Sequence, residues 1–196
     1  PKPNSRRKIV REELDEKLCE KYPLIFKNRN APMTHTAMCW GFEHGDGWYN
    51  IIDVLCGLLY SDYTRAKERY EAVKQYYEKD GKYPWKGGKE ITPEILEELR
   101  LKMIEQEQLV PVASQVKEKF GTLRFYVESS TDEHDDYIRF AERMSARTCE
   151  VCGKPGLIRG RGWLYTACDE HTSKEDKGEN DEQPGDEREA QQEASE

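Results

Sequence analysis

Three cysteines and one histidine form two close pairs near the end of the chain, Cys149-x2-Cys152 and Cys168-x2-His171. Thiolate sulfurs and imidazole nitrogens are common ligands of Zn²⁺, and a two-residue gap lets both members of a pair reach one tetrahedral ion. Disulfides are not expected in an intracellular chain, so close-spaced cysteines there indicate a metal site. The spacing therefore predicts a Cys3His zinc site.

The residues around the two pairs predict a small module that holds the metal. Gly153 follows the first pair and supplies the flexible backbone of a tight knuckle. The fifteen intervening residues are long enough for a hairpin with strands at 157–158 and 163–165, which returns the second pair beside the first. We expect a fold of the zinc-ribbon or treble-clef type, and the sequence does not decide between them. So short a module has little core of its own, so the metal would supply much of its folding free energy.

The predicted zinc site has a structural rather than a catalytic composition. Four protein ligands complete a tetrahedron, whereas catalytic zinc keeps one position open for water. The chain lacks the HExxH motif of zinc proteases and the HxE…PCxxC pattern of zinc deaminases. An iron–sulfur cluster is disfavoured because those sites mostly use four cysteines.

Five basic residues lie on or just before the module and could contact nucleic-acid phosphates or another anion. They are Lys154, Arg159, Arg161, Arg143 and Arg147. Trp163 and Tyr165 lie among them and could stack on bases. The alternative is ordinary solvated charge around a hairpin whose tryptophan packs on the main domain. The overall acidity of the chain argues against nucleic acid.

A second group of polar residues lies in CWGFEHGDGWYN, residues 39–50, and could form a ligand-binding loop. Its candidates are Glu43, His44, Asp46 and Trp48. Together with Asp53, the two carboxylates could also serve a metal-dependent nuclease or hydrolase. Each residue has a structural alternative: Asp46 caps the following helix, the flanking glycines permit a tight turn, and Trp48 fills the core. We assign no catalytic residue.

Hydrophobic periodicity predicts the elements that position these groups. Helices are expected at 6–21, from 47 to 59, at 62–79, from Thr92-Pro93 onward, and at 132–147. A short strand is expected near 38–42, and alternation over 112–127 predicts a β-hairpin that turns at Gly121. Several residues should face inward in the helices after 47 and 132. They are Trp48, Ile51, Ile52, Leu55, Leu58 and Leu59 in the first, and Tyr137, Ile138, Ala141 and Met144 in the second.

Composition and charge indicate how the rest of the chain is organised. The 196 residues carry a net charge of −8, and most of it lies in residues 173–196, which contain ten acidic and three basic residues. That segment has no aromatic or branched apolar residue and is expected to be disordered. No apolar run is long enough to span a bilayer, and the basic start lacks the apolar stretch of a secretory signal. We therefore expect a cytoplasmic protein with no membrane contact.

Three blocks of the sequence resemble one family. They are CWGFEHGDGWYNIIDVLC, SQVKEKFGTLRFYV and MSARTCEVCGKPG followed by GW and T-x-C-x2-H, and with their surroundings they cover roughly residues 14–171. The resemblance is to small zinc-knuckle proteins of tailed bacteriophages and bacterial genomes, for which no activity is established. It implies a phage or prophage setting and hence the host-cell cytoplasm. In that family the last ligand can be cysteine, which fits a metal role for His171, and another residue often stands at His44, which argues against catalysis there.

Together these observations predict an α+β protein in three parts. Residues 1–147 form a mainly helical core domain with a β-hairpin, 148–172 the zinc-binding module, and 173–196 a disordered acidic tail. The expected role is that of a non-enzymatic accessory protein that binds a host protein, nucleic acid or nucleotide ligand. The alternative is the hydrolase described above.

Overall fold

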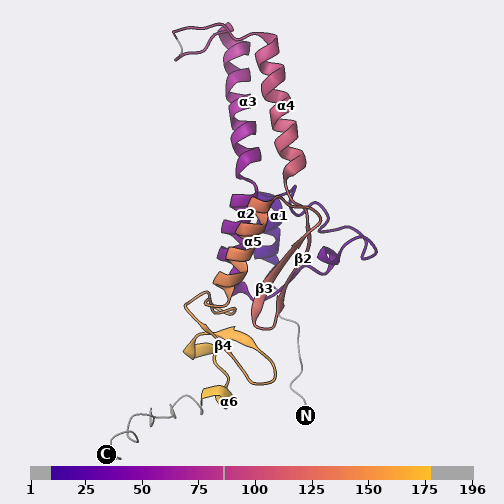
Figure 1. Cartoon of the computed structure of the whole chain (residues 1–196), viewed down its shortest axis with the longest axis vertical. Helices are drawn as coiled ribbons and strands as arrows, with labels where there is room; N and C mark the ends of the chain where they lie inside the picture. The colour runs from indigo at the N-terminus through magenta and orange to yellow at the C-terminus, as the bar shows by residue number, and fades with distance from the viewer. Residues whose placement is uncertain (1–9, 86, 178–196) are drawn as a thin grey trace, which may run out of the picture.

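The computed structural model describes residues 10–85 and 87–177. Three parts follow one another along the longest axis of the molecule: a projecting helical arm, a mixed body and a small terminal module (Figure 1). The body combines helices with a small sheet, so the predicted α+β class is confirmed. No described helix is long and apolar enough to cross a membrane.

The body packs three helices and a three-stranded sheet around one hydrophobic core. The helices are α1 (Glu12–Lys21), α2 (Tyr49–Leu59) and α5 (Asp132–Ser145). The sheet has the order β1-β2-β3, with β1 (Phe42–Glu43) parallel to β2 (Ala113–Lys119) and β2 antiparallel to β3 (Thr122–Val127). The helix α5 lies against both α2 and β3. Phe42, Trp48, Ile52 and Leu123 are fully buried in this core.

The arm consists of α3 (Ser61–Asp80) and α4 (Pro93–Leu109), which run side by side away from the body (Figure 1). The helix α4 begins at the predicted Thr92-Pro93 step, with proline in its first turn. A separate cluster of four buried side chains holds the outer part of the arm together. These are Val73, Tyr83, Ile91 and Leu99.

The predicted hairpin is present, and its turn has unusual backbone geometry. Strands β2 and β3 are joined by Phe120 and Gly121, with φ of 53° and 78°. Two consecutive positive φ values match the right-handed twist of a hairpin, which is why such turns favour glycine and asparagine. Gly121 satisfies this geometry, whereas Phe120 adopts it with a bulky side chain that is 66% exposed.

The module contains β4 (Leu157–Arg159), β5 (Tyr165–Ala167), a 3-10 helix η3 (Asp169–His171) and α6 (Lys174–Lys177). The first predicted strand is confirmed, but the second begins at Tyr165, so Trp163 stands in the connecting loop. Residues 174–177 are helical, although the whole segment from 173 was expected to be disordered. The side chain of Asp176 explains this order, because it accepts hydrogen bonds from Tyr165 Oη and Ser173 Oγ. Residues 178–196 lie outside the described part of the chain.

Three further sequence predictions need correction. The segment near 38–42 forms a 3-10 helix, η1 (Ala37–Trp40), and the strand follows it as β1. Asp46 does not cap α2, which begins three residues later at Tyr49, after the 3-10 helix η2 (Asp46–Trp48). Its carboxylate instead accepts from the backbone N–H of Arg11, at 2.9 Å, and from the Arg11 guanidinium. Leu58 and Met144 were expected inside but are 39% and 40% exposed.

Candidate metal centre

The first ligand pair lies in a tight knuckle directly after α5. The amide of Cys149 donates to Lys154 O at 2.8 Å, and the amide of Gly153 donates back to Cys149 O at 2.9 Å. Gly153 has a φ of 75°, a left-handed conformation that favours glycine. These bonds close the turn and bring both sulfurs of the pair to one side.

The second pair is positioned by the end of β5 and the following helical turn. Cys168 precedes η3, and its carbonyl accepts from the amide of His171 at 3.0 Å and from Thr172 Oγ1 at 2.9 Å. Strand β5 pairs with β4 in antiparallel register, from Leu157 opposite Ala167 to Arg159 opposite Tyr165. The hairpin therefore returns the second pair beside the first, as predicted.

The four donor atoms lie close enough together to hold one metal ion. The sulfurs of Cys152 and Cys168 are 3.7 Å apart, and His171 Nδ1 lies 3.6 Å from Cys149 Sγ and 3.2 Å from Cys168 Sγ. All four atoms lie within 4.8 Å of one another. A regular zinc tetrahedron has S···S edges of about 3.8 Å and S···N edges of about 3.6 Å, given its bond lengths. The cluster could therefore hold one metal ion.

The surroundings of Cys149 favour the thiolate form of its side chain. Burial raises the pKa of Cys149, but hydrogen bonds from the amides of Cys168, Cys152 and Val151 outweigh it and lower that pKa to about 6. The pKa of Cys152 is raised, with the Lys154 amide lowering it and burial and the neighbouring thiols raising it more. Metal binding requires deprotonated thiols, so the amides around Cys149 prepare the site for a cation.

The turn at residues 43–48, here called the acidic turn, is in direct contact with the knuckle at residues 149–153. The sequence predicted the two features separately. The amide of Gly47 donates to Glu150 O at 2.8 Å, and the amide of Gly45 donates to Glu150 Oε1 at 3.0 Å. A Cβ on Gly47 would lie 2.2 Å from Cys149 O, and one on Gly45 would lie 2.4 Å from Glu150 O. Because neither glycine has a positive φ, they serve this close approach rather than a strained turn.

Trp48 extends the contact from the knuckle into the core. Its indole is fully buried, and Nε1 donates to Thr148 O at 2.8 Å. On the other side of the knuckle, the fully buried Thr166 donates through its hydroxyl to Gly121 O at the tip of the β2–β3 hairpin. The module is thus fixed to both the acidic turn and the hairpin of the body.

His44 is fully buried and uncharged rather than an accessible ligand or base. Its ring lies between Phe42 and Trp48, with centroids 5.9 and 6.0 Å away. Burial lowers the pKa of His44 to about 4, so the neutral ring donates from Nδ1 to Gly45 O at 2.8 Å. Nε2 is buried without a hydrogen-bond partner.

The carboxylates of the hydrolase alternative are not brought together. Glu43 accepts from Gln115 Nε2, Asp46 pairs with Arg11, and Asp53 accepts from Lys21 and Tyr22. Within residues 10–85 and 87–177, the Cys3His cluster is the only group of three or more such side chains with metal-binding geometry. The described part of the chain therefore shows no hard-metal site at these carboxylates.

The basic residues in and just before the module differ in their exposure and in their ion pairs. Lys154 pairs with Glu170 and Arg159 with Asp169, and the Arg159 side chain is only 11% exposed. Arg143, Arg147 and Arg161 are exposed. Of the five predicted anion-binding cations, at least Lys154 and Arg159 are thus already paired with carboxylates.

The hairpin of the module exposes apolar side chains instead of packing them on the body. Trp163 is 73% exposed, which is contrary to the alternative that it packs on the main domain. Leu157 and Ile158 on β4 are 60% and 46% exposed, and Val151 in the knuckle is 44% exposed. These exposed apolar side chains all belong to the knuckle and the hairpin of the module.

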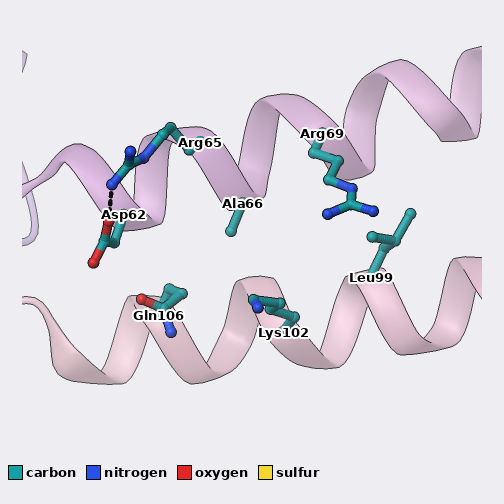
Figure 2. Close-up of a pocket in the computed structure, with 7 residues that line it drawn as sticks. All are labelled: Asp62, Arg65, Ala66, Arg69, Leu99, Lys102 and Gln106. Carbon is teal, nitrogen blue, oxygen red and sulfur yellow. Dashed lines mark hydrogen bonds and ion pairs between the residues drawn. The ribbon is translucent and has the colours of Figure 1, made fainter.

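A recess of about 320 Å³ lies between α3 and α4 (Figure 2). Arg69 and Lys102 border it from opposite helices, whereas Arg65 is held by Asp62 at one end. Ala66 and Leu99 also line it. Arg69 and Lys102 give this recess a positively charged border, and its lining holds no group arranged for catalysis. Nothing local in the sequence distinguishes these two cations from other charges on amphipathic helices.

Glu150 and Thr166 are the residues of the site that sequence reasoning missed. Both are fully buried, and they connect the module to segments about 45 and 105 residues away. A carboxylate between two predicted metal ligands was the only local signal in the sequence, and it did not reveal its partners. No protein-family model, curated protein or solved structure gave a significant match to this chain.

Proposed function

We propose that this chain is a non-enzymatic accessory protein with a structural Cys3His zinc site, which acts by binding another macromolecule. The observation that carries the proposal is the spacing of the four donor atoms, all within 4.8 Å of one another. Three thiolates and one imidazole suit Zn²⁺ better than Mg²⁺, Ca²⁺ or Mn²⁺, which prefer oxygen. Four protein ligands leave no open position for a reacting water.

The contacts of the knuckle support a structural role for the ion. Residues 149–153 have little apolar packing within the module, where the buried cluster consists of Cys149, Ala167 and Cys168. The ion would therefore supply the cohesion that keeps Glu150 in place for the amides of Gly45 and Gly47, and Thr148 in place for the indole of Trp48. A knuckle followed by a hairpin and a helical turn favours the treble-clef alternative over the zinc ribbon.

We propose a protein as the partner, contacted through the exposed apolar hairpin that carries Trp163. The pairing of Lys154 and Arg159 with carboxylates weakens the nucleic-acid alternative, because paired cations release few counterions. A nucleotide or other anion would find its best cations at Arg69 and Lys102 in the arm. The resemblance of the three sequence blocks supports a bacteriophage setting, and hence a host protein in the host cytoplasm.

The structural role is tested by metal removal. We expect a zinc chelator to lower the melting temperature of the reduced protein, and Cys149→Ser and His171→Ala to lower it without chelator. The matched control is Cys39→Ser, a half-buried cysteine outside the cluster, which should respond to chelator as the unaltered chain does. Equal melting temperatures with and without chelator, in protein shown to contain metal, would contradict the structural role.

A further inference from the structure

An apolar recess of about 210 Å³ opens on the outer face of the body, between α2 and α5. Its lining consists of Asn50, Ile51, Val54, Leu55, Leu58, Tyr137, Phe140, Ala141 and Met144. Val54 and Phe140 are 64% and 63% exposed, and Leu58 and Met144 are also at the surface. The side chains that line this recess take no part in the hydrogen bonds that fix the module to the body.

The charges around Phe140 change sign along α5. Glu133 and Asp136 lie toward the start of the helix, Arg143 lies near its end, and Arg147 lies in the turn that follows. With 3.6 residues per turn, Glu133, Asp136 and Arg143 fall within about 60° of Phe140 around the helix, so they share its exposed face. One half of this face is acidic and the other half is basic.

These charges are available for a new contact. Asp136 makes only an exposed pair with Arg139, and Glu133 accepts from Tyr137 Oη, again at the surface. Exposed pairs of this kind contribute little to stability, so exchanging them costs little. No ion pair is recorded for Arg143 or Arg147 within the described residues.

We propose that this face binds a second copy of the chain, with α5 packed antiparallel against the partner's α5 about a two-fold axis at Phe140. A two-fold interface brings residue i against j and j against i. Asp136 then faces the partner's Arg143, and Glu133 faces the partner's Arg147, so each opposite-charge pair forms twice. A partner helix that carried only one sign of charge would place like charges opposite one half of this face. A second copy of α5 carries both signs, so it can pair with both halves.

The apolar residues fit the same arrangement. Phe140 meets the partner's Phe140 at the axis, Tyr137 faces the partner's Met144, and Val54 and Leu58 of α2 cover the side of the contact. The helical stretch from 133 to 145 spans about 18 Å, so the buried area lies toward the lower end of specific interfaces. The dimer should therefore dissociate on dilution rather than persist at all concentrations.

Sedimentation analysis of the full-length, metal-loaded, reduced chain tests the interface. We expect a shift from monomer to dimer with rising concentration, and loss of that shift in Phe140→Ser. The matched control is Leu101→Ser, an exposed apolar residue on α4 that should leave dimerisation unchanged. Because Phe140 is exposed, both variants should keep the parent melting temperature. A chain that remains monomeric at every concentration, or a dimer that Phe140→Ser does not weaken, would overturn the proposal.

A charge exchange tests the two-fold arrangement itself. Asp136→Arg alone and Arg143→Asp alone each place like charges opposite one another and should reduce dimerisation at least tenfold. Mixing the two variants should restore a dimer, because each altered residue then faces its complement in the other chain. The chain that carries both changes should also dimerise alone. Failure of the mixture to associate while the unaltered chain dimerises would overturn the antiparallel pairing.

Discussion

The amide of Gly47 donates a 2.8 Å hydrogen bond to the carbonyl oxygen of Glu150, which lies between the two cysteines of the metal knuckle. The two backbones approach so closely that a Cβ on Gly47 would lie 2.2 Å from Cys149 O. A change in the conformation of the knuckle would therefore disturb the start of α2 and the hydrogen bond of the buried Trp48 indole. The two clusters predicted from the sequence thus form one structural unit.

Gly47→Ala should destabilise the protein and weaken its metal site. The added methyl group meets backbone atoms of Cys149, Cys152 and Gly153, which cannot move without disturbing the ligand turn. We expect a loss of about 1–3 kcal/mol in the free energy of unfolding, as for other overpacked positions, together with lower zinc affinity. Denaturant unfolding and competition with a chromogenic chelator measure these two effects.

The control for this substitution is Gly162→Ala, where a Cβ meets nothing within 4 Å. It should change the free energy of unfolding by no more than about 0.5 kcal/mol and leave zinc affinity intact. Equal behaviour of the two alanine variants would show that the contact between turn and knuckle does not occur in solution.

Stability should fall as the pH falls from about 6.5 to about 4, in part because of His44. The pKa of His44 is lowered by burial from 6.5 to about 4, so between these values the unfolded chain binds a proton that the folded chain does not. The contribution of His44 to the free energy of unfolding is complete above pH 6.5 and declines toward pH 4 by up to about 3 kcal/mol. The free energy of unfolding, measured across this range, should show the decline.

His44→Gln isolates this contribution. The glutamine does not titrate, and the metal ligands titrate alike in both proteins, so the difference between their pH profiles reports His44. The unaltered chain should lose more stability than the variant between pH 6.5 and 4. Parallel profiles would mean that His44 is protonated, or accessible to water, in the folded protein.

Phe120→Asn should stabilise the protein. Phe120 has a φ of 53° in the turn between β2 and β3, a region that asparagine adopts more readily than an aromatic residue, and its side chain packs little. We expect a gain of about 1 kcal/mol, visible as a higher melting temperature. A lower melting temperature would indicate that the exposed ring makes a contact that stabilises the native state.

Arg159→Gln should destabilise the module, although it removes only one of five neighbouring cations. The Arg159 side chain is 11% exposed and pairs with Asp169, so its loss leaves a poorly filled site within the hairpin. Arg143→Gln, at an exposed position on α5, should leave the melting temperature unchanged. If both variants melt like the unaltered chain, then Arg159 is a surface cation and the nucleic-acid alternative regains support.

The ligand set and the hairpins could be predicted because their signals are local. Two-residue gaps bring Cys149 to Cys152 and Cys168 to His171 whatever the rest of the chain does, and Gly121 marks its own turn. Four helices were placed to within a few residues by periodicity, since each needs only its own apolar stripe to identify it. The first, expected at 6–21, begins at Glu12, and residues 6–9 lie outside the described part of the chain. The α+β class follows from these elements.

The predictions that were wrong concern residues whose roles depend on contacts between segments distant in the sequence. Asp46 looked like a helix cap, but its carboxylate is taken by Arg11, 35 residues earlier. Gly45 and Gly47 looked like turn residues because nothing local reveals the approach of Glu150. Leu58 and Met144 were expected to face inward because an apolar stripe does not distinguish a core from an exposed contact surface.

Elemental analysis of the purified, reduced protein is the most direct test of the metal site. The account predicts about one zinc ion per chain, in keeping with a four-ligand site. The ion should be lost or weakened in both Cys149→Ser and His171→Ala, and retained in Cys39→Ser. Folded, reduced protein that carries no zinc, or that retains its zinc in both ligand variants, would contradict the account.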